Sequence, residues 1–170
     1  MPWEYDAPHS RIGFIARHIG LTLVHGYFRK ADVKVDLDVA DPTKSSIEAT
    51  IDAASLTSDF ERRDDAVKGE NYLDVERFPT ITFKSKRVNP RGDSRYAVIG
   101  DLTLHGVTRE IELDTEYFGE VTDPRGNTLR GLAARAKIRK GDFDIHGSPN
   151  DPRAVAEEIQ LVIDAELYNR

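Results

Sequence analysis

The five histidines are the side chains best suited to hold a metal ion or to act as a general base near neutral pH. They are His9, His18, His25, His105 and His146. None belongs to an H-x-H pair or an H-E-x-x-H motif, the short spacings that typically bring two metal ligands together. The chain also has no cysteine, which excludes thiolate ligands, a cysteine nucleophile and disulfides. We therefore predict no metal site and no catalytic residue among these groups.

Motifs for nucleophilic and phosphate chemistry are missing as well. Gly147-Ser148-Pro149 is typical of a loop, not of a strained turn before a helix, and the chain has neither a P-loop nor a G-x-G-x-x-G motif. Carboxylates such as Glu110 and Glu112 alternate with apolar residues, so we expect them on the solvated face of a strand. A small-molecule hydrolase or isomerase, using His18 or Arg109 with a carboxylate, stays open as the alternative function.

Length and charge limit the remaining classes. The 170 residues are the size of one domain, so we predict a single domain over 1–170. The net charge of −6 disfavours binding to nucleic-acid phosphates. No apolar run approaches the roughly 18 residues of a membrane-spanning helix. The first residues lack the basic and apolar regions of a secretion signal, so we expect a cytoplasmic protein, and a periplasmic or secreted one only if the chain is a processed form.

Apolar residues alternate with polar ones along most of the chain, which predicts half-buried β-strands. The clearest strands cover 33–39, 47–51, 96–104, 107–113 and 159–167, and weaker ones cover 10–17, 80–88 and 129–138. Because short turns join these strands, we predict an all-β protein with an antiparallel sheet. A count near eight favours a closed barrel, since closure removes exposed edges.

The pair His105-Gly106 predicts a two-residue hairpin turn between Leu104 and Val107, with glycine supplying the positive φ. This register places Asp101 opposite Glu110, a like-charge pair that costs some stability. It also places Arg109 on the apolar face. Arg109 would then either extend to solvent at the barrel rim or contact the polar head of an amphiphilic ligand.

One stretch interrupts the β pattern, and we predict a short helical insertion around 58–76. Residues 57–59 (Thr-Ser-Asp) are candidate N-caps, the helix covers about 60–68, and Gly69 ends it. The segment 59–65 is dense in charges of both signs. It is either a solvent-facing helix with local ion pairs or a lid over one end of the barrel.

Several inward positions carry small residues, which favours a hollow barrel over a filled one. These are Ala16, Ala49, Gly100, Ala134 and Ala136. The residues that we expect to line a ligand-binding lumen are Phe14, Ala16, His18, Leu37, Ile47, Ala49, Ile51, Ile81, Phe83, Val98, Leu102, Arg109, Ile111, Leu113, Leu132, Ala134, Ala136, Ile138, Ile159, Leu161 and Ile163.

Ordered motifs over about residues 3–168 resemble the YceI-like family. The N-terminal pattern includes Trp3, Asp6, His9-Ser10 and Phe14, and the two most specific runs are 72–85 (YLDVERFPTITFKS) and 100–108 (GDLTLHGVT). The loop at 142–152 departs from the family pattern.

The resemblance implies a lipocalin-like, eight-stranded antiparallel barrel. It further implies non-enzymatic binding, transport or storage of a polyisoprenoid or an isoprenoid quinone in the lumen. We accordingly expect a long-chain isoprenoid lipid as ligand and partner and no other cofactor, and a homodimer is left open.

Overall fold

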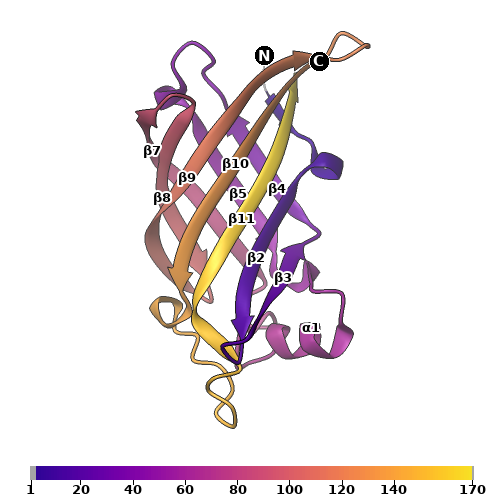
Figure 1. The fold of residues 1–170 in the computed structure, drawn as a ribbon, viewed down its shortest axis with the longest axis vertical. Helices are drawn as coiled ribbons and strands as arrows, with labels where there is room; N and C mark the ends of the chain where they lie inside the picture. Colours follow the sequence, from indigo (N-terminus) through magenta and orange to yellow (C-terminus); the bar gives the residue numbers. More distant parts are fainter. Residues whose placement is uncertain (1–2, 170) are drawn as a thin grey trace.

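The computed structural model describes residues 3–169, and strands dominate it (Figure 1). The strands are β1 (Trp3–Tyr5), β2 (Arg11–His18), β3 (Thr22–Phe28), β4 (Ala31–Asp36), β5 (Ser46–Asp52), β6 (Leu56–Thr57), β7 (Thr80–Gly92), β8 (Arg95–Leu104), β9 (Val107–Thr122), β10 (Thr128–Arg139) and β11 (Val155–Asn169). The helices are α1 (Glu61–Lys68) and the short 3₁₀ turns η1 (Ala7–His9), η2 (Pro42–Lys44), η3 (Ala53–Ser55) and η4 (Lys140–Phe143). Within the described residues, no helix is long and apolar enough to cross a membrane.

These segments form a closed barrel of eight antiparallel strands. Three positions of the wall each consist of two consecutive segments, β1 with β2, β3 with β4, and β5 with β6. The wall closes because β11 pairs with both β1 and β2, while β1 pairs with β4 and β2 pairs with β3. The expected all-β barrel with one short helix is confirmed.

The hairpin between β8 and β9 has the predicted register. Leu104 pairs with Val107, and Asp101 pairs with Glu110. His105 and Gly106 have φ values of 55° and 72°, so both turn residues are left-handed, as in a type I′ turn. The Gly106 backbone also lies against the Phe78 ring, which leaves no space for a β-carbon.

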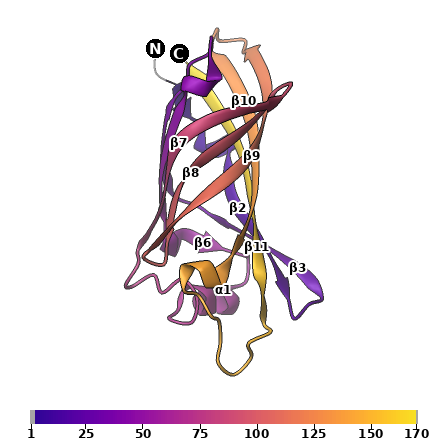
Figure 2. The same ribbon diagram turned by 90° about the vertical axis from the view of Figure 1, so that its left-hand side faces the viewer.

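The helix lies where the sequence predicts it, but it begins differently. Its N-cap residue is Phe60, which makes no side-chain capping bond, and Gly69 is the C-cap residue. Ser58, one of the predicted caps, instead donates from both its backbone N–H and its hydroxyl to the Asp64 carboxylate. The Asp64 carboxylate thus ties a residue before the helix to the first turn, while the first N–H groups of the helix have no side-chain cap. Figures 1 and 2 show α1 at one end of the barrel and the chain termini at the other.

The two faces of the wall differ sharply. Inward residues such as Ile51, Val98 and Leu113 are buried in one apolar cluster. Outward residues on β7, β8 and β9 carry charges of both signs and form ion pairs across the strands, for example between Arg91 and Glu112. The alternation read from the sequence therefore separates an apolar interior from a charged outer surface.

Candidate functional site: an apolar cavity along the barrel

A cavity of about 660 Å³ runs through the barrel. Its wall extends from Tyr5 and Leu167, near the termini, to Phe60, Arg63 and Val155 at the α1 end. The wall is mainly aliphatic and aromatic. This volume lies within the roughly 300–1,000 Å³ that is usual for small-molecule sites. The barrel is therefore hollow, with room for one elongated apolar molecule.

Most of the predicted ligand-binding residues lie on this wall, because the inward positions of the strands face the cavity. They are Phe14, Ala16, His18, Ile47, Ala49, Ile51, Ile81, Phe83, Val98, Leu102, Ile111, Leu113, Leu132, Ala134, Ile138, Ile159, Leu161 and Ile163. That they contact a ligand stays a prediction.

Three predicted residues are not on the cavity wall. Leu37 lies beyond the end of β4, which stops at Asp36 and not at the predicted residue 39. Ala136 is partly buried against the apolar cluster but is not among the residues that line the cavity. Arg109 is exposed, and its Nε–H donates to the Asp142 carbonyl oxygen at 3.0 Å. Arg109 therefore joins β9 to η4 and does not face a ligand in the cavity.

Small inward residues have two different causes. Ala16, Ala49 and Ala134 line the cavity, as the hollow-barrel interpretation requires. Gly100 does not, because the Phe83 ring and the Lys84 carbonyl occupy the place of its β-carbon. The sequence pattern could not separate these cases, since both leave a small residue at an inward position.

The helical insertion supplies part of the wall that the strand pattern missed. Phe60, Arg63, Val67, Tyr72 and Leu73 line the α1 end of the cavity. The lid interpretation of this segment agrees with this placement. The sequence did contain a sign that this segment lines the cavity, namely the interruption of the β pattern. A helix inserted between two barrel strands must either pack over the end of the barrel or project away from it.

A polar cluster fixes the helix at this end. The Ser58 hydroxyl donates to Asp64 and accepts from Arg63 Nε–H at 2.7 Å, and a second Arg63 nitrogen donates to the Ser58 carbonyl oxygen at 2.7 Å. Ser58 and Asp64 are buried, and Ser58 and Arg63 line the cavity. Because the serine hydroxyl is held between a carboxylate and a guanidinium, the cluster orients the Arg63 cation at the mouth.

An ion pair between a buried lysine and a half-exposed glutamate lies where β10 ends. Lys140 lines the cavity, is buried, and its ammonium nitrogen lies 3.2 Å from a Glu157 carboxylate oxygen. The Gly141 N–H donates to the same carboxylate at 2.9 Å. This backbone hydrogen bond, and then Lys140, lower the pKa of Glu157. Glu157 thus neutralises the one lysine on the cavity wall, among the residues that the structure describes.

The end of the barrel near the termini is blocked by a cationic side chain. Arg130 is buried, with its guanidinium 5.0 Å from the Trp3 ring centroid and 5.6 Å from that of Tyr117. A terminal nitrogen of Arg130 donates to Glu120 at 2.6 Å, and burial lowers the Arg130 pKa. These residues are not on the cavity wall, so they form a plug beyond it. The arginine and histidine side chains of the cavity wall, Arg17, His18 and Arg63, lie at the other end, near α1, and we call this end the mouth.

One cluster outside the barrel has metal-ligand chemistry. Ligand atoms of Asp6, His9 and Glu166 lie within 4.8 Å of one another, with His9 Nδ1 2.9 Å from an Asp6 oxygen. Short histidine spacings in the sequence do not reveal this group, because Glu166 comes from the far end of the chain. All three groups have solvent access and Asp6 already neutralises His9, so the geometry also fits an ordinary ion pair.

The barrel and its apolar cavity define a β-barrel of the ligand-enclosing class. The model of the YceI-like domain matches residues 3–167, and the chain belongs to this family. A UPF0312 protein of Serratia proteamaculans is 33% identical over 163 residues, covering 96% of this chain and 83% of that protein. A UPF0312 protein of Photorhabdus laumondii is also 33% identical, over 166 residues, covering 96% and 84%.

Solved structures share the fold. BcnA of Burkholderia cenocepacia superposes with a TM-score of 0.87 at 22% identity, covering 96% of this chain and 99% of that one. A Campylobacter jejuni YceI protein gives 0.80 at 24% identity, covering 91% and 90%. A polyisoprenoid binding domain from Saccharophagus degradans gives 0.72 at 13% identity, covering 100% and 99%.

Proposed function

We propose that this protein binds a long-chain isoprenoid lipid, a polyisoprenoid or an isoprenoid quinone, in the barrel and serves as its carrier or store. The observation that carries the proposal is the elongated apolar cavity, continuous from Leu167 to Phe60. A chain of isoprene units is long, flexible and apolar, so it matches such a space without directional contacts. Membership in the YceI-like family and the polyisoprenoid-binding neighbour from Saccharophagus degradans support the same ligand class.

Burial of the chain alone provides enough free energy for useful affinity. Each methylene removed from water contributes about 0.8 kcal/mol, so about ten contribute roughly 8 kcal/mol. That corresponds to a Kd near micromolar before the costs of association. The lining of aliphatic and aromatic side chains is therefore sufficient, and no catalytic group is needed for the proposed role.

The orientation of the lipid follows from the two ends of the cavity. Beyond one end lies the Trp3 and Arg130 plug, whereas Arg17, His18 and Arg63 line the other. A polar or anionic head group would meet the guanidinium groups of Arg17 and Arg63, the His18 imidazole and water at the α1 end, with the chain extending toward Leu167. Arg63, and not Arg109, is thus the arginine that we expect to contact the polar head group.

Catalysis at the mouth is the weaker alternative. Ser58 is the candidate nucleophile at the mouth, because it contacts the buried Asp64 carboxylate. Its hydroxyl, however, donates to Asp64 and accepts from Arg63. Both bonds hold α1 in place, and His18 is exposed on β2 with no bond to this cluster. This arrangement supports a positioned helix better than an activated nucleophile.

Organic extraction of the purified protein, followed by mass spectrometry, tests the proposal. The expected result is one isoprenoid lipid in near-stoichiometric amount, and reloading of the delipidated protein by an added polyprenol. Extraction that yields no lipid, together with failure of the delipidated protein to bind polyprenol or quinone, would overturn the proposal.

A further inference from the structure

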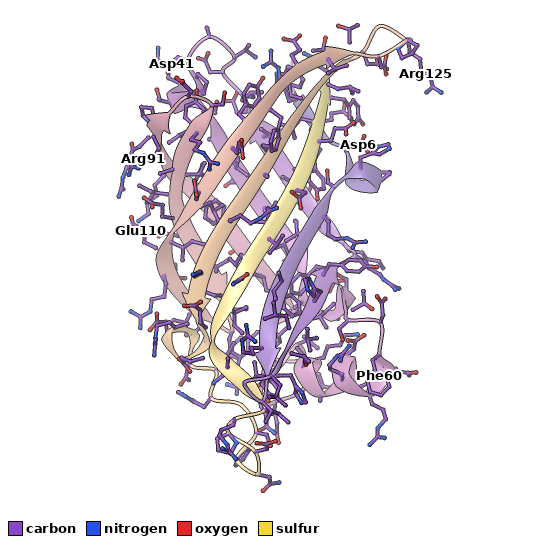
Figure 3. All side chains as sticks on the ribbon, in the orientation of Figure 1. Asp6, Asp41, Phe60, Arg91, Glu110 and Arg125 are labelled. Atoms are coloured by element: carbon purple, nitrogen blue, oxygen red, sulfur yellow. The ribbon has the colours of Figure 1, made fainter. Side chains whose placement is uncertain are left out.

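Large apolar side chains are exposed around the mouth of the cavity. On the β2–β3 hairpin, Ile19 is 44% exposed, Leu21 74% and Leu23 46%, and across the mouth Phe60 is 55% exposed. We call these four residues the mouth surface. Figure 2 shows the hairpin leaning away from the barrel at this end, and Figure 3 shows Phe60 projecting beside α1. The mouth surface therefore projects from the same end at which the cavity has its polar mouth.

The hairpin presents Ile19 at a conformational cost. Its φ is 52°, in the left-handed region, which β-branched residues rarely adopt. Glycine or asparagine would relieve the strain at this turn position. A strained isoleucine with its side chain in water gains little from burial in the isolated protein. Burial within the protein therefore does not offset the strain at this position.

The tip is also held in a fixed place. The Ile19 N–H donates to the Ala154 carbonyl oxygen at 3.2 Å, which ties the turn to the loop before β11. A guanidinium nitrogen of Arg17 donates to the Leu21 carbonyl oxygen at 2.9 Å. The turn is thus braced from both sides, so its apolar side chains project as a fixed unit.

Charge is segregated along this part of the chain. No Asp or Glu occurs between Asp6 and Asp32, although the protein has 30 acidic residues and a net charge of −6. The same stretch contains four cations, Arg11, Arg17, Arg29 and Lys30. The outer faces of β7, β8 and β9, by contrast, pair cations with carboxylates. Arg11 begins β2, at the end away from the tip, and Arg29 and Lys30 line a surface hollow together with Asp59 and Glu61. Of these four cations, Arg17 is therefore the one that lies beside the exposed apolar residues of the tip.

We propose that the mouth surface docks on a lipid bilayer, with the tip Ile19–Leu21 entering the interface and Arg17 meeting anionic head groups. The inference rests on the proposed function, since an isoprenoid lipid resides in membranes and must cross from bilayer to barrel. Apolar side chains beside cations are the combination that favours interfacial insertion with anionic lipids. Docking at this end aligns the cavity mouth with the lipid phase.

Vesicle flotation of the delipidated protein tests docking without an isoprenoid ligand. The wild type is expected to float with phosphatidylcholine vesicles that contain phosphatidylglycerol, and less with phosphatidylcholine alone. Leu21→Asp should lower the partition coefficient about tenfold or more, because it removes a large apolar group from the interface. Val121→Asp is the matched control, because Val121 is 64% exposed on β9 near the opposite end, and it should float like the wild type.

A reporter variant shows which residue inserts. In Leu21→Trp the new indole should shift to shorter emission wavelength when vesicles are added, whereas Trp3 is buried and should change little. Floating of Leu21→Asp at wild-type level, an unshifted Leu21→Trp, or loss of flotation in Val121→Asp instead would overturn the proposal. So would a dimer in size-exclusion chromatography that Leu21→Asp dissociates, because the mouth surface would then bind a second copy. Polyprenol binding by Leu21→Asp, measured in detergent, separates failure of docking from failure of the proposed function.

Discussion

Asp101 and Glu110 face each other across β8 and β9, and the Lys86 ammonium lies 3.0 Å from one carboxylate and 3.1 Å from the other. The hairpin pattern predicts the like-charge pair, but the compensating cation comes from the neighbouring strand β7. Hydrogen bonds to Asp101 and then Glu110 raise the Lys86 pKa. Lys86 on β7 thus offsets the repulsion between Asp101 and Glu110 in the hairpin.

Replacement of Lys86 should expose that repulsion. Lys86→Met is expected to lower the melting temperature at neutral pH, and Lys86→Met with Glu110→Gln should recover part of the loss. Because the folded pKa of Lys86 is raised, its contribution is fully present below the unfolded lysine pKa and is lost as pH rises through the folded value. Melting curves at neutral and strongly alkaline pH measure this. An equal effect of Lys86→Met at both pH values would mean that the lost stability does not come from the charge of Lys86.

The β8–β9 turn should be among the least tolerant positions in the barrel. Gly106→Val forces a β-branched residue to a φ of 72° and drives its β-carbon into the Phe78 ring, so we expect a loss of about 2 kcal/mol or more. Gly126→Val is the control, because Gly126 has a φ of 87° but nothing near its β-carbon position. It should cost less in urea denaturation, and equal losses would assign the whole effect to backbone strain.

The sequence predicted most of the long strands, the β8–β9 pairing and the barrel, because the period-two alternation and the turn residues are local signals. It predicted most of the cavity wall for the same reason. It missed β1, β3 and β6, although β3 forms a hairpin with β2. It misplaced Arg109, since alternation fixes which face a residue occupies and not whether a long side chain turns toward η4. It could not find the cluster of Ser58, Arg63 and Asp64, because those contacts depend on where the helix packs.

Arg63 should distinguish ligands by their head groups. Arg63→Gln is expected to weaken binding of polyprenyl phosphate several-fold more than binding of polyprenol, because charge-assisted hydrogen bonds to phosphate are the stronger ones. Arg109→Gln should change neither affinity, since Arg109 lies off the cavity wall. Titrations of the delipidated protein with both lipids measure this. Equal weakening for the two lipids would limit Arg63 to holding α1 through Ser58.

His9 should titrate above an ordinary histidine. The hydrogen bond with Asp6, the charge of Asp6 and then that of Glu166 raise its pKa. The folded pKa therefore exceeds the unfolded one, so the stabilisation is present at lower pH and is lost as pH rises through the folded value. Histidine NMR titration should give a lower His9 pKa in Asp6→Asn, and a smaller decrease in Glu166→Gln. A larger decrease in Glu166→Gln would contradict this order of causes.

Filling the cavity should abolish lipid binding without unfolding the barrel. Ala49 lies on the cavity wall between Val33 and Phe83 of the adjacent strands, whereas Ala136, which the sequence also placed there, does not line the cavity. In a hollow barrel, Ala49→Trp places its indole in ligand space, so apo stability should stay near the wild type while polyprenol binding is lost. Overpacking of a filled core would instead cost about 1–3 kcal/mol.

Thr50→Trp is the control, because Thr50 is the next residue of β5 and is exposed on the outer face. It should bind polyprenol like the wild type. Urea denaturation of the delipidated variants and polyprenol titration give the two readouts. Ala136→Trp supplies the opposite comparison, since its indole has no cavity to enter and should destabilise the apo protein. If Ala49→Trp is destabilised as strongly as Ala136→Trp, or still binds polyprenol normally, the lipid does not occupy the space beside β5.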